Sequence, residues 1–461
     1  MSPFASIREL ADAIRWKKVS SVELTTMFVK RLESLGKSHR AVAEMTEEHA
    51  MEQARQADNS PARTMLHGIP FGVKDLLATK GIPTRWGSPG HADQVFDYDA
   101  TAVRRLYEHG GVLVAKLEMI ELAGGGNYNV ANASRMGPCA SAWDRKRWAG
   151  GSSSGSGAAT ALGCVPYSLG SETSGSITCP SAFNGCTGFR PTYGRVSRHG
   201  AMALCWTMDK IGPICRSAED CAIVLEAIAG QDSADPSTLA QRLDLRPRGR
   251  RPRIGLLKER FRENNAADCE KAYQDALDVL RKMGYETVEV AYPALPYGLA
   301  VEIIVNAEGA SAHENFIRSE RLTMLADVNQ VAGFAASLET KATDYLWALR
   351  FRNEALKANA IWDQCDCIFT PVFYHAAVAI DKPFDQTFRN MGGDGGPANL
   401  LGWPAIAFPI GFEDGAPLGG QIIAPAYRED VCLRVARDFQ FETDFHLRRP
   451  AEAKLDRWST T

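Results

Sequence analysis

The sequence lacks three features that would each point to a class of protein. No apolar segment approaches the roughly 18 residues of a membrane span. Charges begin at Arg8, where a secretory signal would have its apolar core. Lysine and arginine give no excess of positive charge, because the formal net charge is -3, whereas a nucleic-acid-binding domain usually carries a basic face. We therefore expect neither a membrane nor a nucleic acid as a partner.

Paired cysteines are missing as well. The chain has eleven cysteines, an odd number, spread from Cys139 to Cys432 without repeated C-x-x-C spacing. Disulfide frameworks use an even set of cysteines, and zinc sites use closely spaced ligands. The pattern therefore predicts neither kind of site, and a reducing cytoplasm is the expected location.

The residues that are present predict a globular α/β protein. The 461 residues are 45% hydrophobic and 23% charged, which is enough apolar material for a large core. Ser6 and Glu9 have the spacing of a capping box, which marks the start of a helix. From Leu66 on, short apolar runs such as 69–73 alternate with helical segments such as 101–108. This alternation is typical of a sheet covered by helices.

The second half of the chain continues the alternation. A strand, a helix and a strand are predicted at 253–257, 269–283 and 285–290, and residues 300–363 have mainly helical character. Three later apolar runs predict further buried strands, at 367–372, 405–409 and 420–424.

Lys74 is the first residue that could carry chemistry. It directly follows the apolar run Ile69-Pro-Phe-Gly-Val73. A lysine that folding removes from water has a lowered pKa and can act as a base near neutral pH. Most lysines at strand ends reach solvent instead, so Lys74 alone does not identify a site.

Two segments rich in serine and glycine are the other candidates. The first, Gly150-Gly-Ser-Ser-Ser-Gly-Ser156, allows close backbone approach. The second, Leu169-Gly-Ser-Glu-Thr-Ser-Gly-Ser-Ile-Thr178, offers backbone N–H groups of the kind that hold an oxyanion. Taken singly, the first is also explained as a flexible loop and the second as a turn.

Together these three segments resemble the amidase signature family. That family pairs a G-V-K-D lysine with a G-G-S-S-G-G-S segment and a later G-T-D-T-G-G-S-I turn. Ser152 and Ser176 lie 24 residues apart, as in the family pattern. The resemblance is strongest over residues 66–230, recurs at 402–423, and is weak between about 235 and 390.

The resemblance implies an α/β fold with a large mixed central sheet and helices on both faces. It also implies a single domain over residues 1–461. The expected parts of that domain are an N-terminal helical region, a signature core, a variable and mainly helical region, and a C-terminal part of the core, at 1–65, 66–230, 231–390 and 391–461.

Carried over by position, the resemblance implies a catalytic triad. Ser176 would be the nucleophile, Ser152 the serine held by a cis peptide bond, and Lys74 the general base. The oxyanion hole would consist of the backbone N–H groups of Thr173, Ser174, Gly175 and Ser176. This mechanism requires no metal and no organic cofactor.

The turn around the nucleophile departs from the family pattern. Glu172 stands for the usual aspartate, Ser174 for a glycine and Thr178 for an arginine. Ser174 is small enough to leave the backbone donors in place if its dihedral angles are permitted. The missing arginine changes the charge near the site and weakens any expectation of an acidic substrate.

Substrate choice is expected in the loops where the resemblance is weakest, at 124–140, 199–208, 300–350 and 388–400. An apolar pocket could be built there from Met202, Leu204, Trp206, Phe334 and Trp347. No arginine pair in these loops offers bidentate carboxylate binding. We therefore expect a small neutral, apolar or aryl amide, or a carbamate (urethane), as the only partner of a stand-alone monomer or homodimer.

Three other interpretations remain open. Within the family, Thr192-Tyr-Gly-Arg-Val-Ser-Arg198 looks like the glutamine-hydrolysing A subunit of a tRNA-dependent amidotransferase, although residues 322–327 lack the R-R-x-x-L-G-T type of segment. Alternatively, Gly151-Ser-Ser-Ser-Gly155 matches the G-x-S-x-G elbow of an α/β-hydrolase, with Ser153 as nucleophile and a histidine such as His375. The third is a non-catalytic scaffold that has kept the fold.

Overall fold

One continuous sheet organises the protein. The structure, a computed structural model, describes residues 1–257, 266–387 and 395–454. Its eleven strands are ordered β1-β3-β2-β4-β6-β5-β10-β11-β9-β7-β8. Strand β2 is parallel to β3 and β4, and β7 is parallel to β8 and β9, whereas the other neighbours are antiparallel. The sheet is therefore mixed.

The strands are β1 Val42–Met45, β2 Pro70–Lys74, β3 Val112–Leu117, β4 Tyr167–Glu172, β5 Thr187–Arg190, β6 Lys210–Cys215, β7 Ile254–Leu257, β8 Thr287–Val290, β9 Cys367–Pro371, β10 Ala405–Glu413 and β11 Ala416–Ile423. The helices are α1 Ile7–Arg15, α2 Ser21–Arg31, α3 Glu47–Asp58, α4 Thr101–Glu108, α5 Ser154–Ala161, α6 Thr178–Asn184, α7 Ala218–Ile228, α8 Ala267–Lys282, α9 Tyr297–Ala312, α10 Glu314–Ile317, α11 Val328–Ser337, α12 Ala342–Ala355, α13 Phe384–Thr387, α14 Gly395–Leu400 and α15 Glu429–Glu442.

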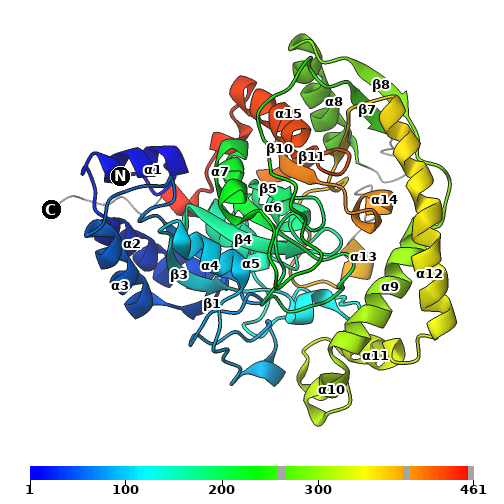
Figure 1. Cartoon of the computed structure of the whole chain (residues 1–461), viewed down its shortest axis with the longest axis horizontal. Coiled ribbons are helices and arrows are strands. Elements are labelled where there is room, and N and C mark those ends of the chain that lie inside the picture. Colours follow the sequence, from blue (N-terminus) through cyan, green and yellow to red (C-terminus); the bar gives the residue numbers. More distant parts are fainter. Residues whose placement is uncertain (258–265, 388–394, 455–461) are drawn as a thin grey trace.

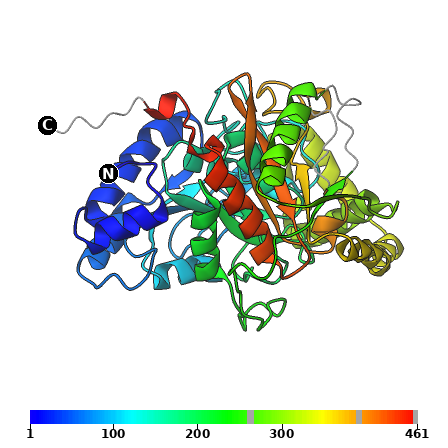
Figure 2. The same cartoon turned by 90° about the horizontal axis from the view of Figure 1, so that it is seen from above.

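Helices cover both faces of the sheet. Helices α5 and α6 pack against each other and against strands of one face. Helices α7, α8 and α15 form the opposite layer, where α15 contacts both α7 and α8. The N-terminal helices α1 to α3 lie at one end of the molecule, and α9 to α12 lie at the other (Figures 1 and 2). This architecture confirms the predicted α/β fold with a large mixed sheet.

Local sequence signals account for several elements. The Ser6 side chain accepts a hydrogen bond from the Glu9 backbone, and the Glu9 side chain accepts one from Ser6, so the predicted capping box begins α1. Helix α4 covers the predicted segment 101–108. Of the predicted strands, 405–409 lies within the longer β10, and 420–424 overlaps the longer β11, which ends at Ile423; β10 and β11 pair as antiparallel neighbours.

The parallel pair β2 and β4 places Lys74 beside Ser171. Val73 pairs with Leu169, so both strands end at the same edge of the sheet. Because parallel strands bring their carboxyl ends together, Lys74 at the end of β2 lies next to Ser171 near the end of β4.

We predict that Gly212→Ala destabilises the fold. Gly212 lies on β6, and a Cβ atom there would stand 2.0 Å from the Phe189 carbonyl oxygen on β5. Overpacking of this kind costs about 1–3 kcal/mol, which urea unfolding would measure. Gly298→Ala is the matched control, because a Cβ atom at Gly298 meets nothing within 4 Å. Equal unfolding free energies for the two variants would contradict the prediction.

Candidate active site

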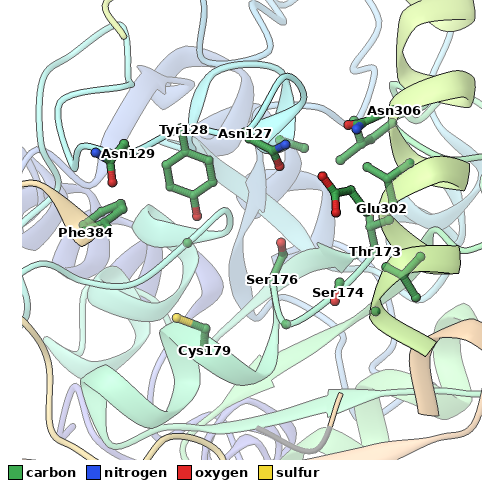
Figure 3. A pocket seen from close by; sticks show the side chains of 18 of the residues that line it. Asn127, Tyr128, Asn129, Thr173, Ser174, Ser176, Cys179, Glu302, Asn306 and Phe384 are labelled. Carbon is green, nitrogen blue, oxygen red and sulfur yellow. The ribbon is translucent and has the colours of Figure 1, made fainter. Parts of the chain in front are cut away.

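A cavity of about 590 Å³ opens beside the serine-rich turn. This volume is in the range of small-molecule sites, about 300–1,000 Å³. Ser176 lies between two groups of side chains (Figure 3). On one side are Tyr128 and Phe384, and on the other is Glu302 of α9. We call this space the Ser176 cavity.

Lys74 is completely buried and is not among the residues that line the Ser176 cavity. Its Nζ atom is 2.7 Å from Ser152 Oγ and 2.9 Å from Ser171 Oγ. Burial lowers the pKa of Lys74 to about 7, against the opposing negative charges of Asp209 and Glu172. Lys74 is therefore able to exchange a proton near neutral pH.

The segment that holds Ser152 is fixed to the turn that holds Ser176. The peptide bond between Gly151 and Ser152 is cis, as the resemblance implies. The Ser153 backbone N–H donates to the Ser176 carbonyl oxygen at 3.3 Å, and Ser153 Oγ donates to the Ser171 carbonyl oxygen at 3.2 Å. The structure thus brings Lys74, Ser152 and Ser176 into one site.

Ser152 and Ser176 form no hydroxyl–hydroxyl hydrogen bond in the described structure. Hydrogen bonds between catalytic groups are often long or misaligned before a substrate binds. The Ser153 hydroxyl, in contrast, is buried and occupied by the Ser171 carbonyl oxygen. This arrangement argues against Ser153 as an exposed nucleophile.

The turn after β4 lines the cavity. Ser174, Gly175 and Ser176 line it, and none of their backbone N–H groups donates to a residue within the described ranges. Gly175 adopts φ 91°, a left-handed conformation that favours glycine. Ser174 keeps a negative φ, so its substitution for a glycine is compatible with the turn.

Glu172 and Thr178, two departures from the family pattern, bond to each other in the structure. Glu172 Oε1 accepts a 2.6 Å bond from Arg190, and Oε2 accepts from the backbone N–H groups of Ile177 and Thr178. The Thr178 hydroxyl also donates to Glu172, at 3.3 Å. Burial alone would raise the pKa of Glu172, but the charges of Arg190 and Lys210 lower it to about 2. The longer side chain thus anchors both ends of the turn.

Asp209 ties the turn to a neighbouring loop, a role that the sequence did not reveal. Its Oδ1 accepts from the Thr173 hydroxyl at 2.5 Å, and its Oδ2 accepts from the backbone of Leu204 and Cys205 at 2.9 Å. Ser171 was also missed as a partner of Lys74. Ser171 offers only the signal of a polar residue within a strand, and Asp209 directly precedes β6.

The cavity lining corrects part of the expected pocket. Of the five apolar candidates, only Leu204 lines the Ser176 cavity. Met202 and Trp206 line a second cavity of about 460 Å³, which shares Ala123, Thr173 and Leu204 with the first. Phe334 is buried in the core and Trp347 is exposed on α12, because the packing of α9, α11 and α12 decides which faces turn inward.

An aromatic cluster, missed in the sequence, forms one wall of the Ser176 cavity. The rings of Trp148 and Phe384 lie 4.5 Å apart, and Tyr128 lies 5.7 Å from Phe384. Opposite them, α9 contributes Glu302 and Asn306. The expected loops 124–140, 199–208 and 300–350 do contribute to the lining, while 388–394 lie outside the described residues.

The described residues contain neither a candidate metal cluster nor a candidate membrane span. No cluster of three or more histidine, cysteine or acidic side chains has the arrangement of a metal site in these ranges. Nor does any described helix combine the length and apolar character needed to cross a membrane.

Comparisons with known proteins identify the family. The amidase family model matches residues 23–433. The chain belongs to the amidase signature family. It is therefore an enzyme that acts on amides, as the sequence predicts.

Individual relatives of this amidase-family chain differ in what they do. The A subunit of the glutamyl-tRNA(Gln) amidotransferase of Cupriavidus necator is 35% identical, covering 97% of this chain and 98% of the relative. A structure from a vestigial complex that reveals the origins of an s-triazine catabolic enzyme has a TM-score of 0.86, 31% identity and coverage of 95% and 98%. A peptide amidase from Stenotrophomonas maltophilia has a TM-score of 0.83, 26% identity and coverage of 95% and 97%.

These relatives correct the expected partners. We predicted only a small-molecule amide or carbamate, no nucleic acid, and a monomer or homodimer. That prediction is wrong, because the Cupriavidus necator relative is by name one subunit of an enzyme of glutamyl-tRNA, and the structure from the vestigial complex is also part of an assembly. The prediction rested on the net charge of the whole chain, but a partner contacts only one local surface, whose charge can differ from the total. None of the three relatives is named for a carbamate.

We predict that Glu172→Gln destabilises the amidase fold. The substitution leaves the buried Arg190 guanidinium without its carboxylate, which costs about 3–5 kcal/mol in urea unfolding at pH 7. Since the folded pKa of Glu172 is about 2, the effect should persist above the pKa of an unfolded glutamate and fade as the pH falls towards about 2. Glu452→Gln, which breaks the exposed pair with Arg145, is the control and should cost at most about 1 kcal/mol. A Glu172→Gln variant as stable as this control would contradict the account.

Proposed function

We propose that the chain hydrolyses a carbon–nitrogen amide-type bond with Ser176 as nucleophile and Ser152 and Lys74 as its proton relay. One observation carries the proposal. Lys74 is completely buried, has a pKa lowered to about 7, and lies 2.7 Å from Ser152 Oγ. Enzymes place lysines in such surroundings when they need a neutral amine as a base.

The relay first carries a proton away from Ser176 towards Lys74 and then returns a proton to the leaving nitrogen. Neutral Lys74 accepts the proton of Ser152, and Ser152 accepts that of Ser176 while Ser176 Oγ attacks the substrate carbonyl carbon. The proton then returns through Ser152 to the leaving nitrogen, and the carbon–nitrogen bond breaks. Water hydrolyses the resulting acyl-enzyme through the same relay in reverse.

The oxyanion hole is the second part of the proposal. The carbonyl oxygen becomes negatively charged in the tetrahedral intermediate and faces the backbone N–H groups of the turn. Loss of one such donor typically costs about 3 kcal/mol of transition-state stabilisation. The donors that we propose are the N–H groups of Thr173, Ser174, Gly175 and Ser176.

For the substrate, we propose a small neutral amide with an apolar or aryl group, or the corresponding carbamate. The aromatic wall of Tyr128, Trp148 and Phe384 supports an aryl or apolar group. The described lining includes the carboxylates of Glu302 and Asp385 but no lysine or arginine. A substrate carboxylate would therefore meet like charge.

A second candidate is hydrolysis of glutamine by the chain as the A subunit of a tRNA-dependent amidotransferase. The 35% identity over 97% of the chain supports it, and the comparisons favour it over the first candidate. The acidic lining of the described cavity favours the first, because glutamine carries a carboxylate. Both candidates use the same relay and differ in substrate and partner.

A cytoplasmic location is part of the proposal. All eleven cysteines are buried, and nine of them, all but Cys164 and Cys269, are free thiols in the structure. Free buried thiols are typical of proteins in a reducing compartment.

We predict that kcat/KM rises with pH through an apparent pKa of about 7. Protonated Lys74 cannot accept the Ser152 proton, so activity should fall as the pH drops below its lowered pKa. The fall in kcat/KM at low pH is measured with an aryl amide at a concentration well below its KM. The Lys74→Ala variant should lose nearly all turnover at every pH. Turnover in Lys74→Ala that retains the wild-type pH profile would contradict the role.

We also predict a preference for neutral over carboxylate-bearing substrates. The assay compares an anilide, its matched aryl carbamate, a carboxylate-bearing anilide and glutamine, with arylamine or ammonia release as the readout. Glu302→Gln should raise kcat/KM for the carboxylate-bearing anilide about 1.4- to fivefold, the scale of an exposed charge interaction of about 0.2–1 kcal/mol. It should leave the neutral anilide unchanged.

The glutamine arm separates the two candidates. Ammonia release from glutamine that exceeds turnover of every neutral amide, with or without partner subunits, would establish the second candidate and refute the first. Turnover of the neutral anilide or carbamate by the chain alone, with glutamine untouched, would establish the first.

A further inference from the structure

Lys210 is a second buried lysine beside the turn, and the proposed relay does not use it. It begins β6 and pairs in register with Glu172 of β4. Only 2% of its surface is exposed. Its Nζ donates to the Asn399 side-chain oxygen at 2.9 Å and to the Thr173 carbonyl oxygen at 3.3 Å. Lys210 thus contacts the backbone of the turn directly.

Burial of an ammonium group is costly, so its surroundings matter. Within the described residues, no carboxylate oxygen lies within 4.0 Å of Lys210 Nζ. Glu172, the nearest partner by register, is already held by Arg190 at 2.6 Å. A buried charge without a close ion-pair partner is expensive. Burial lowers the pKa of Lys210 to about 7, although the negative charges of Glu172 and Asp209 act from beyond 4.0 Å to favour its ammonium form. The direct contacts of Lys210 are therefore the two hydrogen bonds to Asn399 and Thr173.

The contact with Thr173 has a chemical consequence for the neighbouring peptide group. The Thr173 carbonyl belongs to the same planar peptide as the Ser174 N–H, and in a trans peptide these two groups point in opposite directions. Lys210 binds the carbonyl side, while Ser174 lines the Ser176 cavity and its N–H has no acceptor within the described ranges. The Lys210 amino group thus contacts the carbonyl end of a peptide group whose N–H belongs to a residue that lines the cavity.

A hydrogen bond to a peptide oxygen polarises the whole amide group. It draws electrons from nitrogen to oxygen and makes the N–H a stronger donor, an effect that grows in a low-dielectric interior. A donor fixed before the reaction stabilises developing charge without reorganisation. The Asp209 bond to the Thr173 hydroxyl holds the same residue from a second direction.

We propose that Lys210 is a positioning residue that acts through the Thr173 carbonyl oxygen to orient and strengthen the Ser174 N–H as an oxyanion donor. This inference rests on the proposed hydrolysis at Ser176. It assigns to Lys210 an effect on the transition state and none on binding of the uncleaved substrate.

The test compares Lys210→Met with Asn399→Leu on the best amide substrate of the wild-type protein. Lys210→Met removes the charge from the turn, so kcat and kcat/KM should both fall about 10- to 100-fold, less than the roughly 10²–10³-fold loss from deleting a donor. KM should stay within about twofold. Asn399→Leu removes the other acceptor of Lys210 but leaves the Thr173 contact, so kcat should stay near the wild-type value. An unchanged kcat in Lys210→Met, a loss confined to KM, or an equal loss in Asn399→Leu would overturn the inference.

A second measurement applies if Lys210→Met does not fold. Lys210→Gln keeps a hydrogen-bond donor but removes the charge. A trifluoromethyl ketone forms a tetrahedral adduct with a serine nucleophile, and its affinity should fall by the same factor as kcat/KM in Lys210→Gln. The affinity of a non-hydrolysable ground-state analogue should not change, and equal losses for both ligands would refute the inference.

Failure of the proposed function is seen separately, in the wild-type protein. Wild-type protein that neither turns over an amide nor forms the ketone adduct at Ser176 would refute the hydrolysis and the role of Lys210 together. Wild-type turnover through Ser176 with no effect of the Lys210 variants would refute only the role of Lys210.

Discussion

The 2.7 Å contact between Lys74 and Ser152 is the interaction on which the site depends. A lysine in water is protonated at neutral pH and cannot accept a proton, so the contact is useful only because the sheet and its helices remove Lys74 from solvent. The resulting pKa of about 7 couples the chemistry to the packing of the whole core. Any change that lets water reach Lys74 raises this pKa and weakens the base.

The mixed sheet supplies the geometry for this burial. Strands β2 and β4 are parallel neighbours, so Lys74 and Ser171 lie at one edge of the sheet, where their side chains form a 2.9 Å hydrogen bond. Glu172 fixes the turn through Arg190, while Asp209 fixes it through the Thr173 hydroxyl. The reactive groups are thus held by side chains from distant parts of the chain, which is how enzymes keep a site preorganised.

Much of the fold followed from sequence pattern, but the site did not follow from pattern alone. The capping box at Ser6 and the strand ending at Lys74 reflect local rules, and both are present in the structure. The meeting of Lys74 with Ser152 came only from the family resemblance. The aromatic wall with Trp148 and the contacts of Lys210 depend on tertiary packing that no local signal records. The wrong prediction about partners has the same origin, because an overall charge says nothing about one surface.

Labelling with a serine-directed fluorophosphonate, followed by peptide mass spectrometry, tests the central claim most directly. The reagent reacts with an activated serine hydroxyl, so its position reports the nucleophile without knowledge of the substrate. The account predicts an adduct on Ser176 that is lost in Lys74→Ala. An adduct on Ser153, or an adduct on Ser176 that persists in Lys74→Ala, would contradict it, as would wild-type protein that takes up no label.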